Sequence, residues 1–376
     1  MMQYLTAGES HGPCLLAILE GMPSGLKIEE AFINTELQRR QRGYGRGARM
    51  QIEADKVEIL SGLKNKVTIG SPLTLKIENK DWTIDSLKEI TVPRPGQADL
   101  AGAIKYREGI REISERASAR ETAARVAVGA VCKLLLKEFN IEILSWTLSI
   151  GKIKIKFSPQ LSDLDSSKKI LLDSQLNCPD AEAEELMITE LDKAIQNGDS
   201  LGGVVEIALV HLPVGLGSYV DWRRRLDGRL AQAIMSIPSV KGVEIGLGFK
   251  ATQCLGSEVQ DEIFYNAKEK RFYRKTNNAG GLEGGMTNGE PLILRFGLKP
   301  IPTLKNPLKS VNIVSKKEAG AAVERADTCI VPAAGVIGEA VVAFELARAM
   351  QEKFGGDSLE EMKRNYNGYC EDVRNF

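Results

Sequence analysis

Histidine is scarce in this chain of 376 residues, because only His11 and His211 are present. Histidine is the side chain whose ordinary pKa lies closest to neutral pH, so the candidates for proton transfer reduce to these two. The six cysteines are scattered, with no C-x-x-C pair and no metal-ligand spacing. The sequence therefore predicts no metal site and no disulfide framework, and it favours buried thiols in a reducing cytoplasm.

Net charge and long apolar runs are also absent. The chain has 50 basic and 50 acidic residues, which argues against bulk attraction to nucleic acid or to a membrane surface. No stretch approaches the roughly 18 to 20 apolar residues of a membrane span, and the first residues lack the pattern of a signal peptide. We therefore expect a cytoplasmic globular protein without a nucleic-acid or membrane partner.

Helical and strand patterns alternate irregularly along the chain, which is typical of the α+β class. We expect one helix to begin after Ser118, and three further helices to span 180–196, 222–235 and 332–354. The expected strands span 148–157, 204–212 and 291–298. Since no linker or short repeat interrupts these patterns, we expect a single domain over 1–376, with 158–200 as a variable surface insertion.

The two histidines lie in different contexts. His11 lies in Gly8-Glu9-Ser10-His11-Gly12, after a short apolar stretch, which predicts a tight turn at the end of a strand. A serine beside a histidine suggests a nucleophile and its base, and the alternative is a loop histidine without chemistry. His211 lies within the apolar strand pattern 207–212, where a structural role is the better interpretation.

Five arginines and three glycines fall between Arg39 and Arg49. Guanidinium groups bind carboxylates and phosphates through paired hydrogen bonds, and glycines let the backbone approach a ligand closely. The cluster therefore indicates a small, highly anionic ligand. A solvated basic face and an RNA-binding segment are the alternatives, and the second lacks the repeated aromatic side chains that stack on bases.

A second arginine motif surrounds Ser118. The spacing of Ser118 and Glu121 predicts a capping box at a helix start, and Arg116 and Arg120 flank it. A helix N-terminus offers N–H groups to a phosphate, although ordinary capping is the alternative.

Three further segments are candidates for loops that line a ligand. The glycine-rich block 277–289 lacks the spacing of a Walker loop and the placement of a dinucleotide-binding fingerprint. Two prolines stiffen the 299–303 segment, and Arg325-Ala326-Asp327 precedes the helix at Pro332.

Taken in order, these blocks resemble the chorismate synthase family over most of the chain. The blocks that carry the resemblance are 8–12, 39–50, 70–72, 94–96, 118–123, 240–244, 277–289, 299–303 and 325–327. The resemblance implies a β-α-β sandwich, with helices between antiparallel sheets. It also implies a carbon–oxygen lyase of aromatic amino-acid biosynthesis, which converts 5-enolpyruvylshikimate 3-phosphate to chorismate and phosphate by a 1,4-anti elimination. The family uses reduced FMN and is usually a homotetramer, and NADPH is a candidate reductant.

The resemblance also implies roles for single residues. His11 corresponds to the general acid near the leaving phosphate, and Ser10 and Asp327 to a proton relay from flavin N5. The substrate- or NADP-binding arginines are Arg40, Arg46 and Arg49. The FMN-contact positions are Arg116, Ala117, Ser118, Pro238, Ser239, Gly284, Lys299, Pro300, Ile301, Pro302, Thr303 and Arg325.

Gln97 departs from the family, which normally has a second catalytic histidine at this position. Glutamine does not titrate near neutral pH, and loss of a general acid or base typically costs about 10²- to 10⁴-fold in rate. Three interpretations stay open: an active enzyme in which water or a neighbour handles the proton, an engineered change, or a weakened or non-catalytic flavin-binding relative.

Overall fold

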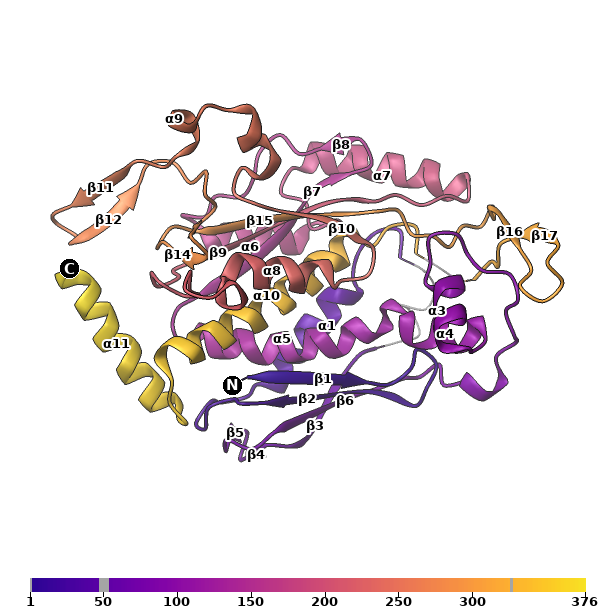
Figure 1. The fold of residues 1–376 in the computed structure, drawn as a ribbon, viewed down its shortest axis with the longest axis horizontal. Coiled ribbons are helices and arrows are strands. Elements are labelled where there is room, and N and C mark those ends of the chain that lie inside the picture. Colours follow the sequence, from indigo (N-terminus) through magenta and orange to yellow (C-terminus); the bar gives the residue numbers. More distant parts are fainter. Residues whose placement is uncertain (1, 47–53, 325–326) are drawn as a thin grey trace.

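Two antiparallel sheets enclose a layer of helices in the computed structural model, which describes residues 2–46, 54–324 and 327–376 (Figure 1). The first sheet has the order β1 (Gln3–Ala7), β2 (Cys14–Glu20), β6 (Leu73–Glu78) and β3 (Val57–Ser61). The second has the order β10 (Val240–Ile245), β15 (Leu292–Leu298), β9 (Gly203–Val210), β7 (Glu142–Ile150) and β8 (Ile153–Lys154). The expected α+β sandwich is confirmed.

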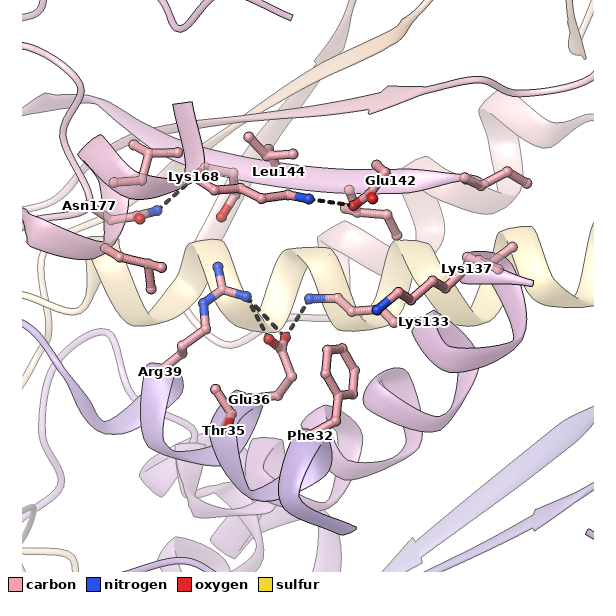
Figure 2. Close-up of a pocket in the computed structure, with 16 residues that line it drawn as sticks. Phe32, Thr35, Glu36, Arg39, Lys133, Lys137, Glu142, Leu144, Lys168 and Asn177 are labelled. Carbon is pink, nitrogen blue, oxygen red and sulfur yellow. Dashed lines mark hydrogen bonds and ion pairs between the residues drawn. The ribbon is translucent and has the colours of Figure 1, made fainter. Parts of the chain in front are cut away.

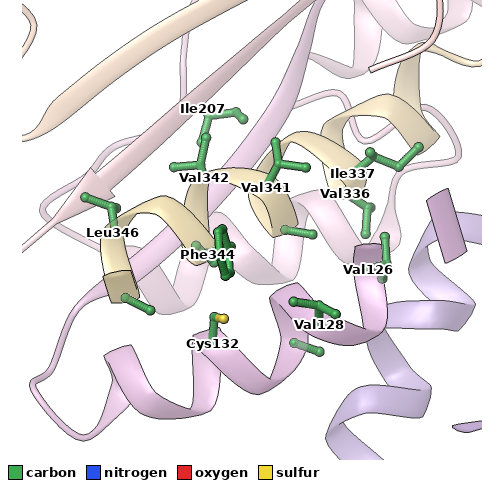
Figure 3. Packing of buried hydrophobic residues seen from close by; sticks show 14 of the residues in the cluster. Val126, Val128, Cys132, Ile207, Val336, Ile337, Val341, Val342, Phe344 and Leu346 are labelled. Atoms are coloured by element: carbon green, nitrogen blue, oxygen red, sulfur yellow. The ribbon is translucent and has the colours of Figure 1, made fainter. Parts of the chain in front are cut away.

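The middle layer consists of α1 (Glu30–Gln41), α5 (Thr122–Lys137) and α10 (Val331–Phe354). α5 contacts β2 and β6 on one side and β7 on the other, while α10 packs on α5, β7 and β9. Figure 3 shows valine and cysteine side chains of α5 facing apolar residues of α10. The two helices approach closely at Gly129, where an added Cβ would lie 2.4 Å from the Cα of Ala340.

The other elements connect or flank these layers. The helical ones are α3 (Asp99–Tyr106), α4 (Ile110–Ala117), α6 (Leu164–Asp173), α7 (Ala181–Gln196), α8 (Leu226–Met235), α9 (Gly256–Val259) and α11 (Leu359–Asn375), with 3₁₀ turns η1 (Ile84–Ser86), η2 (Ala119–Glu121), η3 (Trp222–Arg224) and η4 (Gly248–Gln253). Short two-stranded ribbons are β4 (Leu63–Lys64) with β5 (Val67–Thr68), β11 (Ile263–Asn266) with β12 (Arg271–Arg274), β13 (Leu282–Glu283) with β14 (Met286–Thr287), and β16 (Lys309–Val311) with β17 (Glu318–Gly320).

Most of the predicted elements are confirmed, and two need correction. The predicted helix 222–235 is divided into η3 and α8. The predicted strand 148–157 is wrong, because β7 ends at Ile150 and the chain turns back into β8. Ile150 pairs with Ile153 across the turn. The two residues are three positions apart, so the apolar positions change phase at the turn, and the alternation of 153–156 belongs to β8 and the residues that follow it.

The 158–200 segment contributes to the core instead of lying wholly on the surface. Leu176, Met187 and Leu191 are fully buried, and Leu171 of α6 packs against Trp146 of β7. The variability of this segment stays a prediction.

Candidate functional site

The loop Gly8–Gly12 joins β1 to β2 and is held from two sides. The main-chain N–H of Ser10 donates to the carbonyl of Glu115 in α4 over 3.0 Å. The side-chain amide of Asn79 donates to the carbonyl of Gly12 over 2.8 Å. Gly8 has a φ of +107°, and an added Cβ would lie 2.4 Å from the carbonyl oxygen of Cys14. The predicted tight turn at a strand end is confirmed.

His11 points its ring at the carboxylate of Glu115. Its Nδ1 lies 2.8 Å from Oε1, and its main-chain N–H donates to Oε2 over 2.7 Å. The other ring nitrogen, Nε2, lies 3.9 Å from Oδ2 of Asp81. Partial burial raises the pKa of Glu115, but the hydrogen bonds from His11 outweigh this and hold the pKa below its ordinary value. The backbone and the ring of His11 are thus both held in place by Glu115.

Ser10 and Ser118 meet at the start of the α5 segment. The hydroxyl of Ser118 donates to the hydroxyl of Ser10 over 3.1 Å and accepts the N–H of Arg120. Only half of the predicted capping box forms, because Glu121 binds Thr6 and Arg125 instead of reaching back. The cap therefore begins η2, and α5 follows it.

Arg116 also holds the His11 loop. Its guanidinium donates to the carbonyl oxygens of Gly8 and Thr6 over 3.0 and 2.9 Å. Ala117 ends α4 directly beside it.

A buried charge network links Arg40 to this loop. One oxygen of Asp55 accepts from Arg40 and the other accepts from Arg120, both over 2.7 Å. Arg120 also donates to the side-chain oxygen of Asn79 over 2.8 Å. Burial by itself raises the pKa of Asp55, but the two arginines hold it below its ordinary value. The network extends from Arg40 to the residue that holds the His11 loop.

Arg46 and Asp327 form an ion pair of 3.0 Å, which joins a predicted substrate anchor to a predicted relay residue. The main chain is fixed nearby, since the N–H of Thr328 donates to the carbonyl of Gly45 over 2.8 Å. The predicted site residues Arg49 and Arg325 lie outside the described residues.

Arg94 connects the loop that carries Gln97 to two other parts of the site. Its guanidinium forms a paired interaction with Asp99, at 2.8 and 2.9 Å. It also donates to the hydroxyl of Thr303 over 3.2 Å and to the hydroxyl of Ser114 over 2.9 Å. Because Ser114 precedes Glu115 in α4, the Gln97 loop and the His11 loop are supported by the same helix.

The 299–303 segment lies against the same loop. The ammonium of Lys299 donates to the carbonyl of Gly96, and its main-chain N–H donates to the carbonyl of Ser239 over 2.9 Å. Burial is the main cause that lowers the pKa of Lys299, and the nearby positive charge of Lys241 lowers it further. Gln97 is half-buried beside Gly96. Pro238 precedes Ser239, while Pro300, Ile301 and Pro302 complete the segment between Lys299 and Thr303.

Gly284 is the predicted flavin contact that the fold places elsewhere. It lies in the turn between β13 and β14, and neighbouring Gly281 packs on Pro291 and Leu292 at the start of β15. Lys299 follows the other end of that strand. Six residue steps in a strand span about 20 Å, so Gly284 and Lys299 do not meet within one chain.

Arg39 also points away from the predicted anion site. It binds Glu36 and the fully buried Glu339 of α10, as Figure 2 shows for its contact with Glu36. Arg39 and Glu36 line a pocket of about 310 Å³ between α1, α5, α6 and β7. Arg39 and Arg40 are neighbours on α1 but have different partners. Arg39 binds acidic side chains in the core, whereas Arg40 binds Asp55 in the network beside the His11 loop.

The predicted strand position of His211 needs correction. It lies one residue beyond β9, is exposed, and has a φ of +63°. Its Nδ1 lies 3.1 Å from the carbonyl oxygen of Asn140. The apolar run preceding it suggested a strand position, but the chain turns here.

Sequence reasoning missed Asp55, Asn79 and Glu115, which hold the predicted residues in place. Each lies 15 or more positions along the chain from its partner, so no local spacing marks the pair. In the described parts of the chain, no group of three or more histidine, cysteine or acidic side chains is arranged for a metal ion. The same parts contain no helix of the length and apolarity that a membrane span requires.

Comparison with known proteins adds independent findings. The family model described as chorismate synthase matches residues 2–351. A chorismate synthase of Desulforudis audaxviator is 54% identical, with 100% of this chain and 98% of the relative covered. One from Desulforamulus reducens is 55% identical, with both chains fully covered. A crystal structure titled chorismate synthase superposes with a TM-score of 0.84 at 45% identity, covering 100% of this chain and 99% of the other.

Proposed function

The chain belongs to the chorismate synthase family of carbon–oxygen lyases acting on phosphates, and from this premise we propose the reaction in detail. It eliminates phosphate from 5-enolpyruvylshikimate 3-phosphate in the 1,4-anti sense, with reduced FMN, and forms chorismate. The observation that supports this most directly is the position of His11. Its ring is held by Glu115, and its loop is linked to the buried contacts of Arg40 and Arg120 with Asp55. That arrangement suits a substrate with a phosphate and two carboxylates.

The cationic groups and the proton-transfer groups have different roles in this proposal. Arg40, Arg46 and Arg49 bind the anionic groups of the substrate, or of NADP(H). Protonated His11 donates a proton through Nε2 to the departing phosphate oxygen, since Nδ1 faces Glu115. Ser10 and Asp327 pass on the proton that leaves the substrate ring, supported by Ser118 and Arg46.

Most of the predicted flavin-contact residues suit FMN. The guanidinium of Arg116, the ammonium of Lys299 and the hydroxyl groups of Ser118 and Ser239 are the donors that a phosphate and a polar ring edge require. Gly96 leaves room for this approach, because an added Cβ would lie 3.1 Å from the Lys299 ammonium. Bound there, reduced FMN would supply transient electron density to the substrate, with no net redox change. Gly284 does not fit this set within one chain.

Anaerobic turnover with pre-reduced FMN tests the proposal. Phosphate release and chorismate formation are followed for the wild type, His11→Ala and His211→Gln. We expect His11→Ala to reduce turnover by about 10²- to 10⁴-fold, because a general acid is lost. We expect His211→Gln to match the wild type, since His211 is exposed outside the site. Phosphate release no higher than background would reject the enzyme and favour a non-catalytic flavin-binding relative.

Four further properties stay predictions: one domain over 1–376, a homotetramer, a cytoplasmic location, and NADPH as the reductant. Light scattering measures the oligomer directly. Flavin reduction by NADPH under anaerobic conditions distinguishes a chain that reduces its own cofactor from one that needs an external supply.

A further inference from the structure

We propose that Glu115 is the positioning residue of His11, and that it fixes the ring hydrogen on Nδ1 so that Nε2 is the nitrogen that exchanges protons. This inference rests on the proposed role of His11 as the acid that faces the leaving phosphate. It adds a residue that the sequence motifs did not assign.

The first support is geometric. Both oxygens of one carboxylate are used by one residue: Oε2 accepts the main-chain N–H of His11 over 2.7 Å, and Oε1 lies 2.8 Å from Nδ1. One contact fixes the backbone of His11 and the other fixes its ring. Together they restrict the rotation of the side chain, so that Nε2 has a defined direction.

The second support is the charge state of Glu115. Partial burial raises its pKa, but the contacts with His11 and the neighbouring Arg111 hold it below the ordinary value. An ionised carboxylate can only accept hydrogen bonds, so the hydrogen between the two groups belongs to Nδ1. In the neutral ring, Nε2 therefore carries the lone pair, and a proton is gained and lost there.

The surrounding charged groups are consistent with this division. Asp81, in the segment after β6, lies 3.9 Å from Nε2. Arg111, on α4 with Glu115, is paired with Glu324 at 2.9 Å. Glu9, in the loop of His11 itself, approaches Gly12. Of these, Asp81 is the group that faces the exchanging nitrogen, while Glu115 faces the fixed one.

The third support is the rigidity of Glu115. Its side chain is 5% exposed, and its carbonyl accepts the N–H of Ser10. The preceding Ser114 is bound by Arg94, whose loop leads to Gln97. One residue of α4 thus sets the position of Ser10 and the orientation of His11.

The wild-type protein provides a direct test, because it has two histidines and therefore two sets of imidazole signals. The ¹⁵N chemical shifts of histidine-labelled protein distinguish the two neutral tautomers at high pH, and His211→Gln assigns the signals. We expect His11 to carry its hydrogen on Nδ1. A neutral His11 with its hydrogen on Nε2 would overturn the inference without the need for any Glu115 variant.

Glu115→Gln then separates positioning from simple support. The amide can accept from either tautomer or donate to the ring, so we expect a mixture of tautomers at His11 and no change at His211. We expect kcat to fall by about tenfold to hundredfold, with KM changed less than threefold, because small misplacements of a reacting group reduce rates strongly.

The outcomes distinguish this inference from the proposed function. A Glu115→Gln variant that keeps the wild-type tautomer and kcat, beside an inactive His11→Ala, contradicts the role of Glu115 alone. Mixed tautomers in Glu115→Gln would support the positioning of His11 by Glu115. If Glu115→Gln and His11→Ala both kept full turnover as well, the role of His11 as the acid would be contradicted.

Discussion

Arg40 and Arg120 share one buried carboxylate, that of Asp55, and each takes a different oxygen at 2.7 Å. Asp55→Asn would leave two buried guanidinium groups with less negative charge nearby. Removal of one partner from a buried ion pair typically costs about 3 to 5 kcal/mol, and we expect a loss of that size in the free energy of unfolding. Urea unfolding followed by circular dichroism measures it.

Asp221→Asn is the matched control, since Asp221 pairs with Arg223 on the surface. Exposed pairs contribute little, so we expect the urea midpoint of this control to be unchanged. A similar loss of stability in both variants would contradict the special role of Asp55.

Glu339 makes stability dependent on acid pH. Burial by itself raises its pKa, but Arg39 and Lys133 hold it at about 2, against an ordinary value of 4.5. Because the folded state lowers this pKa, the stabilisation is complete above about pH 4.5 and is lost as the pH falls toward 2. We expect Glu339→Gln to weaken the pH dependence of unfolding in this window, as measured by urea titrations at several pH values. Glu360→Gln, at an exposed position of α11, should retain the wild-type dependence.

Gln97 cannot transfer a proton near neutral pH, so in an active enzyme another group must perform that step. Its side chain can still contribute a hydrogen bond, worth about 0.5 to 1.5 kcal/mol. We therefore expect Gln97→Ala to reduce anaerobic turnover by less than about tenfold, far less than His11→Ala. Gln97→His adds the opposite comparison, and a large increase in its rate would show that position 97 limits the reaction.

Two glycine substitutions in helices should have opposite effects. Gly129→Ala would place a Cβ 2.4 Å from both the Cα and the Cβ of Ala340. Overpacking of this kind costs about 1 to 3 kcal/mol, which exceeds the gain in helix propensity. Gly368→Ala on α11 meets no atom within 4 Å, so we expect it to stabilise the protein by up to about 1 kcal/mol. Thermal unfolding of both variants measures the difference in sign.

The sequence predicted those elements whose signals are local. β15 buries Leu292, Leu294, Phe296 and Leu298 alternately, and this period of two was visible in the residues. The long helix α10 begins with Pro332 in its first turn and ends at Gly355, as its start and stop signals indicated. At 148–157 the same kind of signal failed, because the alternating residues belong to two strands that are joined by the turn between Ile150 and Ile153.

The contacts that organise the site were not predictable in this way. Glu115 lies 104 positions from His11, and Arg120 lies 65 positions from Asp55. Pairs so distant are brought together only by the packing of whole elements. The motifs identified the groups that act, whereas the groups that hold them became visible only in the folded chain.

The close crossing of α5 and α10 has a consequence for the site. The His11 loop follows β1 in the first sheet, and Lys299 follows β15 in the second. The separation of these two loops therefore depends on the thickness of the helix layer between the sheets, and Gly129 and Ala340 are in close contact within that layer. A methyl group added there would alter the width of the site from within the core, without contact with any residue that binds the substrate.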